Sequence, residues 1–224
     1  MIDSNPSDQK QLVYFADPMC SWCYGFSPAM SAIAERFGPD VPIRLVMGGL
    51  RAGNTVPMRD KDKEYIQSAW QNVAAASGQP FDFSLFDRQG WIYDTEPACR
   101  AVVTMRRMAP DHALAFMARI QQAFYAQGQD VTKDGVLAAL AGEFGIEPLE
   151  FAAHFTSAAA REETWTDFAI GTKSGVRGFP TLLAGTDAEG YSVVTNGFAA
   201  AEPVLEALAK WVAAASAAST TPRR

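Results

Sequence analysis

Two cysteines separated by two residues stand where a strand pattern gives way to a helix pattern. The segment Cys-Ser-Trp-Cys occupies residues 20–23. Before it, residues 12–15 form a short run of β-branched and aromatic side chains, which is typical of a buried strand. After it, Met30, Ile33 and Phe37 recur at helical spacing. This order limits the fold to one in which a strand leads directly into a helix that begins at the cysteine pair.

That placement predicts a reactive dithiol. The first turn of a helix has free backbone N–H groups and a partial positive charge, so a thiolate at Cys20 is favoured over a thiol. Cys23 follows one turn later on the same side, within reach of Cys20 for a disulfide. Cys20 can then attack a substrate disulfide, and Cys23 can resolve the mixed disulfide that forms.

Two plainer interpretations of the pair remain open. The pair could be half of a zinc site, but such a site needs two more ligands at matching spacing. Cys99, His112 and His154 supply no second pair, so we predict no metal site. Alternatively, the two cysteines could be unreactive members of the core, beside apolar neighbours such as Trp22.

The rest of the chain predicts an α/β protein with a helical insertion. Residues 43–47 form a second strand pattern, whereas residues 58–157 contain only amphipathic helix patterns. A helix over 158–173 and strands over 181–183 and 191–195 follow, before a last amphipathic helix. We therefore predict one domain from residues 1–57 and 158–224, a small mixed sheet with helices on both faces, interrupted by a helical subdomain at 58–157.

Composition narrows the function and the location. Hydrophobic residues make up 48% of the chain and charged residues 20%, as in soluble globular proteins. The net charge of -6 disfavours binding to nucleic acid. Every apolar stretch is shorter than the roughly 18 residues of a membrane span, and the polar residues 1–10 do not resemble a secretory signal. We therefore predict a cytoplasmic protein that binds neither nucleic acid nor membrane.

Two segments resemble a known family. Residues 17–26, Asp-Pro-Met-Cys-Ser-Trp-Cys-Tyr-Gly-Phe, are similar to the active-site segment of the DsbA family of the thioredoxin superfamily. More narrowly, they resemble the cytosolic FrnE-like branch of protein-disulfide isomerases. Residues 175–181, Gly-Val-Arg-Gly-Phe-Pro-Thr, resemble the family's cis-proline loop, and Pro28 lies where related helices carry a kinking proline. The resemblance implies a thioredoxin-like fold with a large all-helical, DsbA-like insertion.

The resemblance also implies a site and an activity. A cis peptide at Phe179–Pro180 would bring the Phe179 backbone beside Cys20, where a substrate peptide could pair with it as an added strand; Trp22 would complete the substrate-binding surface. The plainer alternative is that Pro180 only begins a strand. The implied substrates are protein or peptide disulfides, with glutathione or a thioredoxin-type protein as reductant and no cofactor beyond the dithiol. In a reducing compartment, we expect reduction or isomerisation of disulfides.

Some residues depart from the family pattern or lack an assigned role. Thioredoxin-like enzymes often bury a carboxylate six residues before the first cysteine, where this chain has Tyr14. Water or Asp17 could carry the proton of Cys23 instead, although Asp17 equally suits a turn or helix cap. Cys99 is interpreted as a buried packing residue in preference to a regulatory thiol. We expect Arg106 and Arg107 on a solvated face.

The aromatic residues and the wider family leave further alternatives. Trp70, Trp91 and Trp165 are predicted to be core residues. Kappa-class glutathione transferases and hydroxychromene-carboxylate isomerases resemble this architecture, but they use a serine near the Cys20 position and need no second cysteine. A binding or chaperone module without redox activity is the third functional class.

Overall fold

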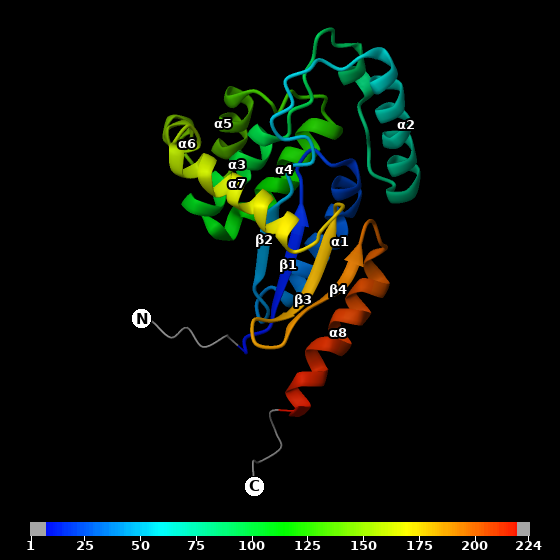
Figure 1. Ribbon diagram of the computed structural model, residues 1–224, viewed down its shortest axis with the longest axis vertical. Helices are drawn as coiled ribbons and strands as arrows, with labels where there is room; N and C mark the ends of the chain where they lie inside the picture. Colours follow the sequence, from blue (N-terminus) through cyan, green and yellow to red (C-terminus); the bar gives the residue numbers. More distant parts are fainter. Residues whose placement is uncertain (1–7, 219–224) are drawn as a thin grey trace.

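A four-stranded mixed sheet forms the centre of the protein. The computed structural model describes residues 8–218. The strand order is β2-β1-β3-β4, with β1 parallel to β2 and antiparallel to β3, and with β3 and β4 joined as an antiparallel hairpin (Figure 1). The strands are β1 (Gln11–Ala16), β2 (Ile43–Met47), β3 (Thr181–Thr186) and β4 (Gly190–Asn196). The predicted strand order along the chain is confirmed.

Helices cover both faces of this sheet. Helices α1 (Ser21–Phe37) and α8 (Ala201–Ala218) pack on one face, and α7 (Ala158–Lys173) packs on the other (Figure 1). On the α7 face, Val13, Phe15 and Val46 form an apolar cluster. Because β1 is central and has helices on both sides, five of its six residues are buried.

A block of helices lies beyond the carboxyl ends of β1 and β2 (Figure 1). Its elements are α2 (Asp60–Ser77), η1 (Phe83–Asp87), α3 (Glu96–Met108), η2 (Pro110–His112), α4 (Ala113–Tyr125), α5 (Asp134–Gly142) and α6 (Pro148–Phe155). Aromatic side chains join these helices, because the Trp70 ring of α2 lies 4.8 Å from the rings of both Phe86 in η1 and Tyr125 in α4. These rings belong to the same hydrophobic core as α1, since Tyr125 stacks on Tyr24 with ring centroids 5.0 Å apart.

Hydrogen bonds and an ion pair from charged side chains connect this block to the edge strand β2. Arg106 of α3 donates to the Leu45 carbonyl at 2.6 Å and to the Asp167 carboxylate of α7 at 2.8 Å. Asp167 in turn accepts the Met47 backbone N–H at 2.9 Å. The expectation of a solvated Arg106 is wrong, because its side chain is 23% exposed and bridges three elements. These bonds occupy backbone groups of an edge strand that would otherwise be open.

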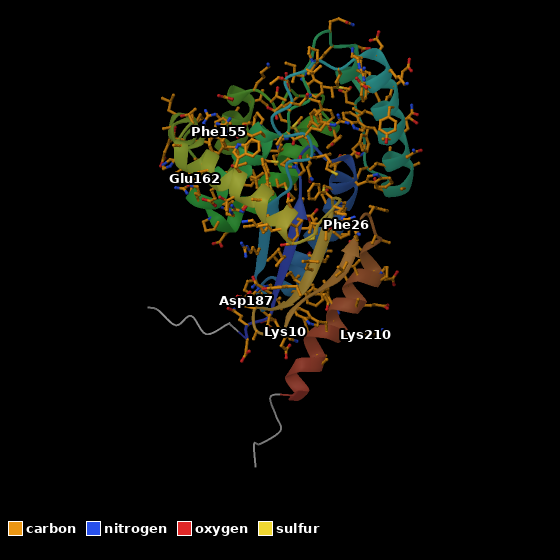
Figure 2. All side chains as sticks on the ribbon, in the orientation of Figure 1. Lys10, Phe26, Phe155, Glu162, Asp187 and Lys210 are labelled. Atoms are coloured by element: carbon orange, nitrogen blue, oxygen red, sulfur yellow. The ribbon has the colours of Figure 1, made fainter. Side chains whose placement is uncertain are left out.

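The far end of the sheet has its own anchor. Lys10, just before β1, donates to the carbonyls of Trp211 and Val212 in α8 at 2.7 and 2.8 Å. Figure 2 shows Lys10 at the end of the sheet away from the helical block. The cysteine segment follows the opposite end of β1, so the site lies between the sheet and the helical block.

One predicted core residue is in fact at the surface. Trp70 and Trp91 are buried as expected, but Trp165 on α7 is 52% exposed. The Trp165 ring packs edge-on against Phe168, with the ring centroids 5.2 Å apart. The helical spacing alone did not show which side of α7 faces the sheet, since this helix has both apolar and polar residues around its circumference.

Candidate redox site

The cysteine pair lies at the junction of β1 and α1. After β1 ends at Ala16, a tight turn brings the Cys20 N–H to the Asp17 carbonyl at 3.0 Å. Cys20 is the N-cap of α1 with extended backbone, and its carbonyl accepts the first helical bond from Tyr24 at 3.0 Å. No side-chain hydrogen bond caps this helix. The predicted strand–turn–helix context of Cys20 is therefore confirmed.

The two sulfurs lie close together and differ in their surroundings. Both cysteines are free thiols within hydrogen-bonding reach of each other. Cys20 is 5% exposed, whereas Cys23 is fully buried. Burial, and then the neighbouring Cys20, hold the pKa of the Cys23 thiol well above its usual range. Cys23 is thus a protonated, enclosed thiol, and Cys20 is the member of the pair that faces the surface.

Pro28 interrupts the backbone hydrogen bonds of α1 about one turn after Cys23. Because proline has no N–H, the Tyr24 carbonyl has no helical partner at that position. The hydroxyl of Ser27 donates to this carbonyl at 2.8 Å, and the amide of Gln79 from the segment after α2 donates at 3.4 Å. The first part of α1 is therefore tied to the helical block.

The cis-proline loop lies directly over Cys20. The Phe179–Pro180 peptide is cis, as predicted, and the Phe179 carbonyl oxygen lies 3.5 Å from Cys20 Sγ. The Pro180 carbonyl accepts the Gly197 N–H at 2.7 Å, which ties the loop to the end of β4. Trp22, half-buried, packs against Phe198 with ring centroids 5.6 Å apart. Of the predicted site residues, Cys23 and Phe179 lie beside Cys20 Sγ, whereas Trp22 packs against Phe198.

Glycine at position 48 makes the approach of this loop possible. A Cβ atom on Gly48 would lie 2.3 Å from Cζ of the Phe179 ring, far inside contact distance. The Phe179 ring therefore packs flat against the backbone just after β2. This contact fixes the ring on one side while the carbonyl of the same residue faces Cys20.

A buried carboxyl group lies on the inner side of the site. Asp17 is fully buried and accepts the N–H groups of Met19 at 2.8 Å and Leu50 at 2.7 Å. Burial raises the pKa of Asp17, although these hydrogen bonds act in the opposite direction. Asp17 is therefore a turn residue, as considered from the sequence, but it also binds a loop 33 residues further along the chain.

Tyr14 occupies the position where related enzymes often bury a carboxylate. Its hydroxyl is buried without a hydrogen bond to nitrogen or oxygen in the described part of the chain, and it lies beside the Cys23 thiol. Burial and the two neighbouring cysteines hold the pKa of Tyr14 well above its usual range. The Tyr14 hydroxyl is therefore a neutral group next to Cys23 and carries no charge at neutral pH.

The helical block supplies residues to the site that sequence reasoning did not place there. Tyr93 donates to the Met19 carbonyl at 2.5 Å, immediately before Cys20, and its hydroxyl lies 3.4 Å from that of Tyr125. Thr95 and Cys99 both contact the Asp17 carboxyl group. The sequence did not place these residues at the site, because they lie far from Cys20 along the chain. The one available sign was an isolated cysteine, Cys99, on an otherwise apolar helix face.

Comparison with known proteins agrees with this geometry. Residues 11–208 match the model of the DSBA-like thioredoxin domain. The chain belongs to this family. The family resemblance and the DsbA-like thioredoxin fold expected from the sequence are thereby confirmed, and the family is one of thiol–disulfide oxidoreductases.

Two solved structures are similar to this chain over most of their length. A provisionally assigned protein disulfide isomerase from Nitrosomonas europaea has 33% identity and a TM-score of 0.84, covering 91% of this chain and 98% of that one. The cytosolic disulfide reductase DsbM from Pseudomonas aeruginosa has 29% identity and a TM-score of 0.70, covering 82% and 88%. DsbM has also been solved with glutathione.

The curated relatives that match this chain include ClpXP adapter proteins. The ClpXP adapter SpxH of Halalkalibacterium halodurans is 24% identical over 193 residues, covering 81% of this chain and 63% of SpxH. SpxH of Bacillus subtilis is 21% identical over 179 residues, covering 80% and 59%. The chain therefore spans about three fifths of the length of the curated relatives it matches.

No helix within residues 8–218 combines the length and the apolar character needed to cross a bilayer. The same residues contain no group of three or more histidine, cysteine, aspartate or glutamate side chains placed to bind a metal ion.

Proposed function

We propose that this protein is a thiol–disulfide oxidoreductase in which Cys20 is the nucleophile and Cys23 the resolving thiol. The observation that carries the proposal is the arrangement of the two sulfurs. Cys20 stands at the start of α1 beneath the Phe179 carbonyl and has some exposure, whereas Cys23 is enclosed behind it. A substrate can meet Cys20 first, and Cys23 can then reach the same sulfur from inside the protein.

The reaction transfers two electrons in two exchange steps. The Cys20 thiolate attacks one sulfur of the substrate disulfide, and the other substrate sulfur leaves as a thiolate that takes a proton. Cys23 then loses its proton and attacks Cys20 Sγ, which releases the second substrate sulfur and closes the Cys20–Cys23 disulfide. The substrate disulfide is reduced to two thiols, and the protein dithiol is oxidised.

The substrate is proposed to bind beside the cis-proline loop. An extended peptide would pair with the Phe179 backbone, Pro180 would keep that carbonyl facing Cys20, and Trp22 would form the opposite side. The packing of Trp22 on Phe198 and of the Phe179 ring on Gly48 supports this assignment, because both flanking side chains are held in place.

We propose reduction of protein or peptide disulfides in the cytoplasm as the direction of turnover. The cytosolic disulfide reductase DsbM, 29% identical to this chain, supports both the direction and the location, and its structure with glutathione supports glutathione as the reductant. A thioredoxin-type protein is the alternative reductant. Isomerase activity would follow from the same dithiol, and no cofactor beyond the dithiol is needed for either reaction.

The decisive experiment is insulin reduction with glutathione as electron donor. Wild type is expected to turn over, Cys20→Ser to be inactive, and Cys23→Ser to accumulate a mixed disulfide visible by intact mass. Wild-type activity no higher than that of Cys20→Ser would refute the proposal. Conjugation of an electrophile to glutathione that survives Cys23→Ser would favour the glutathione-transferase alternative.

A second candidate function is protein binding without turnover. It is favoured by the similarity to SpxH, a ClpXP adapter, over 81% of this chain. Under this proposal, a variant with both Cys20→Ser and Cys23→Ser would still bind its protein partner or suppress aggregation of an unfolded client. Loss of that binding in the double variant would tie it to the dithiol.

A further inference from the structure

A pocket outside the redox site lies between helices α1 and α4. Near the start of α1 and the end of α4, Tyr24 stacks on Tyr125 with ring centroids 5.0 Å apart. Gly38 and Pro110 line one cavity at the other end, so the two helices run antiparallel. The pocket between these ends has a volume of about 260 Å³, and its lining begins at Ser27, about one turn beyond the cysteine pair. The proposed redox steps use none of its lining residues.

The walls of this pocket are apolar. They are formed by Met30 and Ala34 from α1 and by Leu114, Met117 and Ala118 from α4. On each helix these residues recur every three or four positions, so they share one face. Both methionines are buried, and methionine side chains adapt to occupants of irregular shape. The pocket is therefore suited to a small apolar body.

Gln121 brings an amide to this apolar pocket. It lies one turn after Met117 on the same face of α4, lines the pocket and is fully buried. Within residues 8–218, neither its Oε1 nor its Nε2 has a hydrogen-bond partner. Buried amides are almost always hydrogen-bonded, because a buried donor or acceptor without a partner has lost its bonds to water. Packing alone therefore does not explain a glutamine at this position.

The serine hydroxyls of the pocket are already hydrogen-bonded within α1. The Ser27 hydroxyl donates to the Tyr24 carbonyl at 2.8 Å, and the Ser31 hydroxyl donates to the Ser27 carbonyl at 3.1 Å. Neither hydroxyl donates to Gln121. Both atoms of the Gln121 amide are therefore free to bond a group that enters the pocket from outside.

These two free atoms favour one kind of head group. In the Gln121 side chain, Oε1 accepts and Nε2 donates, side by side on one planar group. A carboxamide presents the complementary donor and acceptor in the same arrangement, so it can make both hydrogen bonds at once. A carboxylate can only accept. The described residues that line the pocket include no lysine, arginine or histidine to pair with an anion, whereas the exposed Asp111 is among them. A neutral head is therefore favoured over an anionic one.

We propose that the pocket between α1 and α4 binds a small neutral carboxamide, with its head on the Gln121 amide and its apolar body against Met30 and Met117. The binding is noncovalent and does not involve the dithiol, so this inference goes beyond the proposed redox function and does not rest on it. The volume of about 260 Å³ is slightly below that of sites for drug-sized ligands, about 300–1,000 Å³. The ligand is therefore about the size of one substituted ring. A water molecule bound to the amide is the alternative occupant.

The test is a titration of the full chain with benzamide, followed by NMR of the backbone and side-chain amide groups. Benzamide should shift the signals of residues 27–34 and 114–121, including the side-chain amide of Gln121. Acetophenone keeps the ring and the carbonyl but has no N–H donor, so Gln121 Oε1 would stay unpaired in its complex. We therefore expect acetophenone to bind about tenfold more weakly than benzamide. Benzoate, which is anionic, should bind more weakly than either.

Three variants assign this binding to the pocket. Gln121→Met removes both amide atoms with little change in volume, and it should bind benzamide and acetophenone equally. The matched control is Gln122→Met, because Gln122 is the next residue of α4 but is exposed and does not line this pocket. This control should keep the preference for benzamide. Ala118→Leu places a larger side chain in the pocket and should weaken the binding of both probes.

The result that overturns the inference is binding that does not depend on the amide. Wild type that fails to bind benzamide, or that binds it no more tightly than acetophenone, would leave water as the partner of Gln121. A Gln121→Met variant that keeps the preference for benzamide would equally overturn the inference. Should Gln121→Met not fold, Ala118→Leu decides, and wild-type affinity for benzamide in that variant overturns it. Insulin reduction tests the proposed function separately.

Discussion

The contact between Gly48 and the Phe179 ring allows a sharp test of how the cis-proline loop supports the site. In Gly48→Ala, the new Cβ would lie 2.3 Å from the ring, whereas ordinary contacts begin at 3.4 Å, so the ring must move by about 1 Å. The carbonyl of the same residue lies 3.5 Å from Cys20 Sγ. Overpacking of this kind costs about 1–3 kcal/mol of unfolding free energy. A displacement of about 1 Å at a reacting centre can cost about 100-fold in rate.

We therefore expect Gly48→Ala to lower kcat/KM for insulin reduction by about 10- to 100-fold and to lower the unfolding free energy measured in urea. The double variant Gly48→Ala with Phe179→Leu should recover part of both losses, because leucine lacks the ring atoms that the new methyl meets. Gly135→Ala in α5 is the matched control, since a Cβ there meets nothing within 4 Å. Wild-type kinetics and stability in Gly48→Ala, or a double variant no better than the single, would refute this account of the loop.

Two further predictions concern the protonation of the cysteine thiols and the contacts that Arg106 makes with β2 and Asp167. The pKa values of the buried Cys23 and Cys99 thiols are raised well above the usual range. Iodoacetamide at about pH 7 should therefore alkylate one thiol per native chain and three per denatured chain, as counted by intact mass. Rapid labelling of a second thiol in the native protein would contradict this prediction. Arg106→Ala leaves the buried Asp167 without its cation and should lower the unfolding free energy measured in urea by about 3 kcal/mol. Arg107→Ala, which removes a side chain that is 40% exposed, should lower it by less than about 1 kcal/mol. Equal losses would show that the contribution of the Arg106 contacts does not depend on burial.

Much of the fold was predictable because its signals are local. The apolar run before Cys20, the helical spacing after it and the turn between the last two strands each lie within a few residues, and all correspond to observed elements. The cis peptide at Phe179–Pro180 followed from the family resemblance of a short segment. The roles assigned to the side chains of the site remain predictions.

The surroundings of the site were not predictable, because they depend on pairs far apart in the sequence. Asp17 meets Leu50, and Arg106 meets Asp167, only once the helical block has packed on the sheet. Arg106 and Arg107 are identical neighbours in the sequence, yet the side chain of the first is 23% exposed and that of the second 40%. Trp165 shows the converse, since an apolar side chain was assigned to the interior although its position on α7 faces outward.

The small exposed area of Cys20 sets a requirement on whatever exchanges with it. A disulfide exchange needs the two substrate sulfurs in line with the attacking one, and only 5% of Cys20 is open to solvent. A cystine packed inside a compact protein would not reach a sulfur with so little exposed surface. Under the proposed function, we therefore expect reactive partners to present their sulfur on a protruding loop, an unfolded stretch or a small molecule.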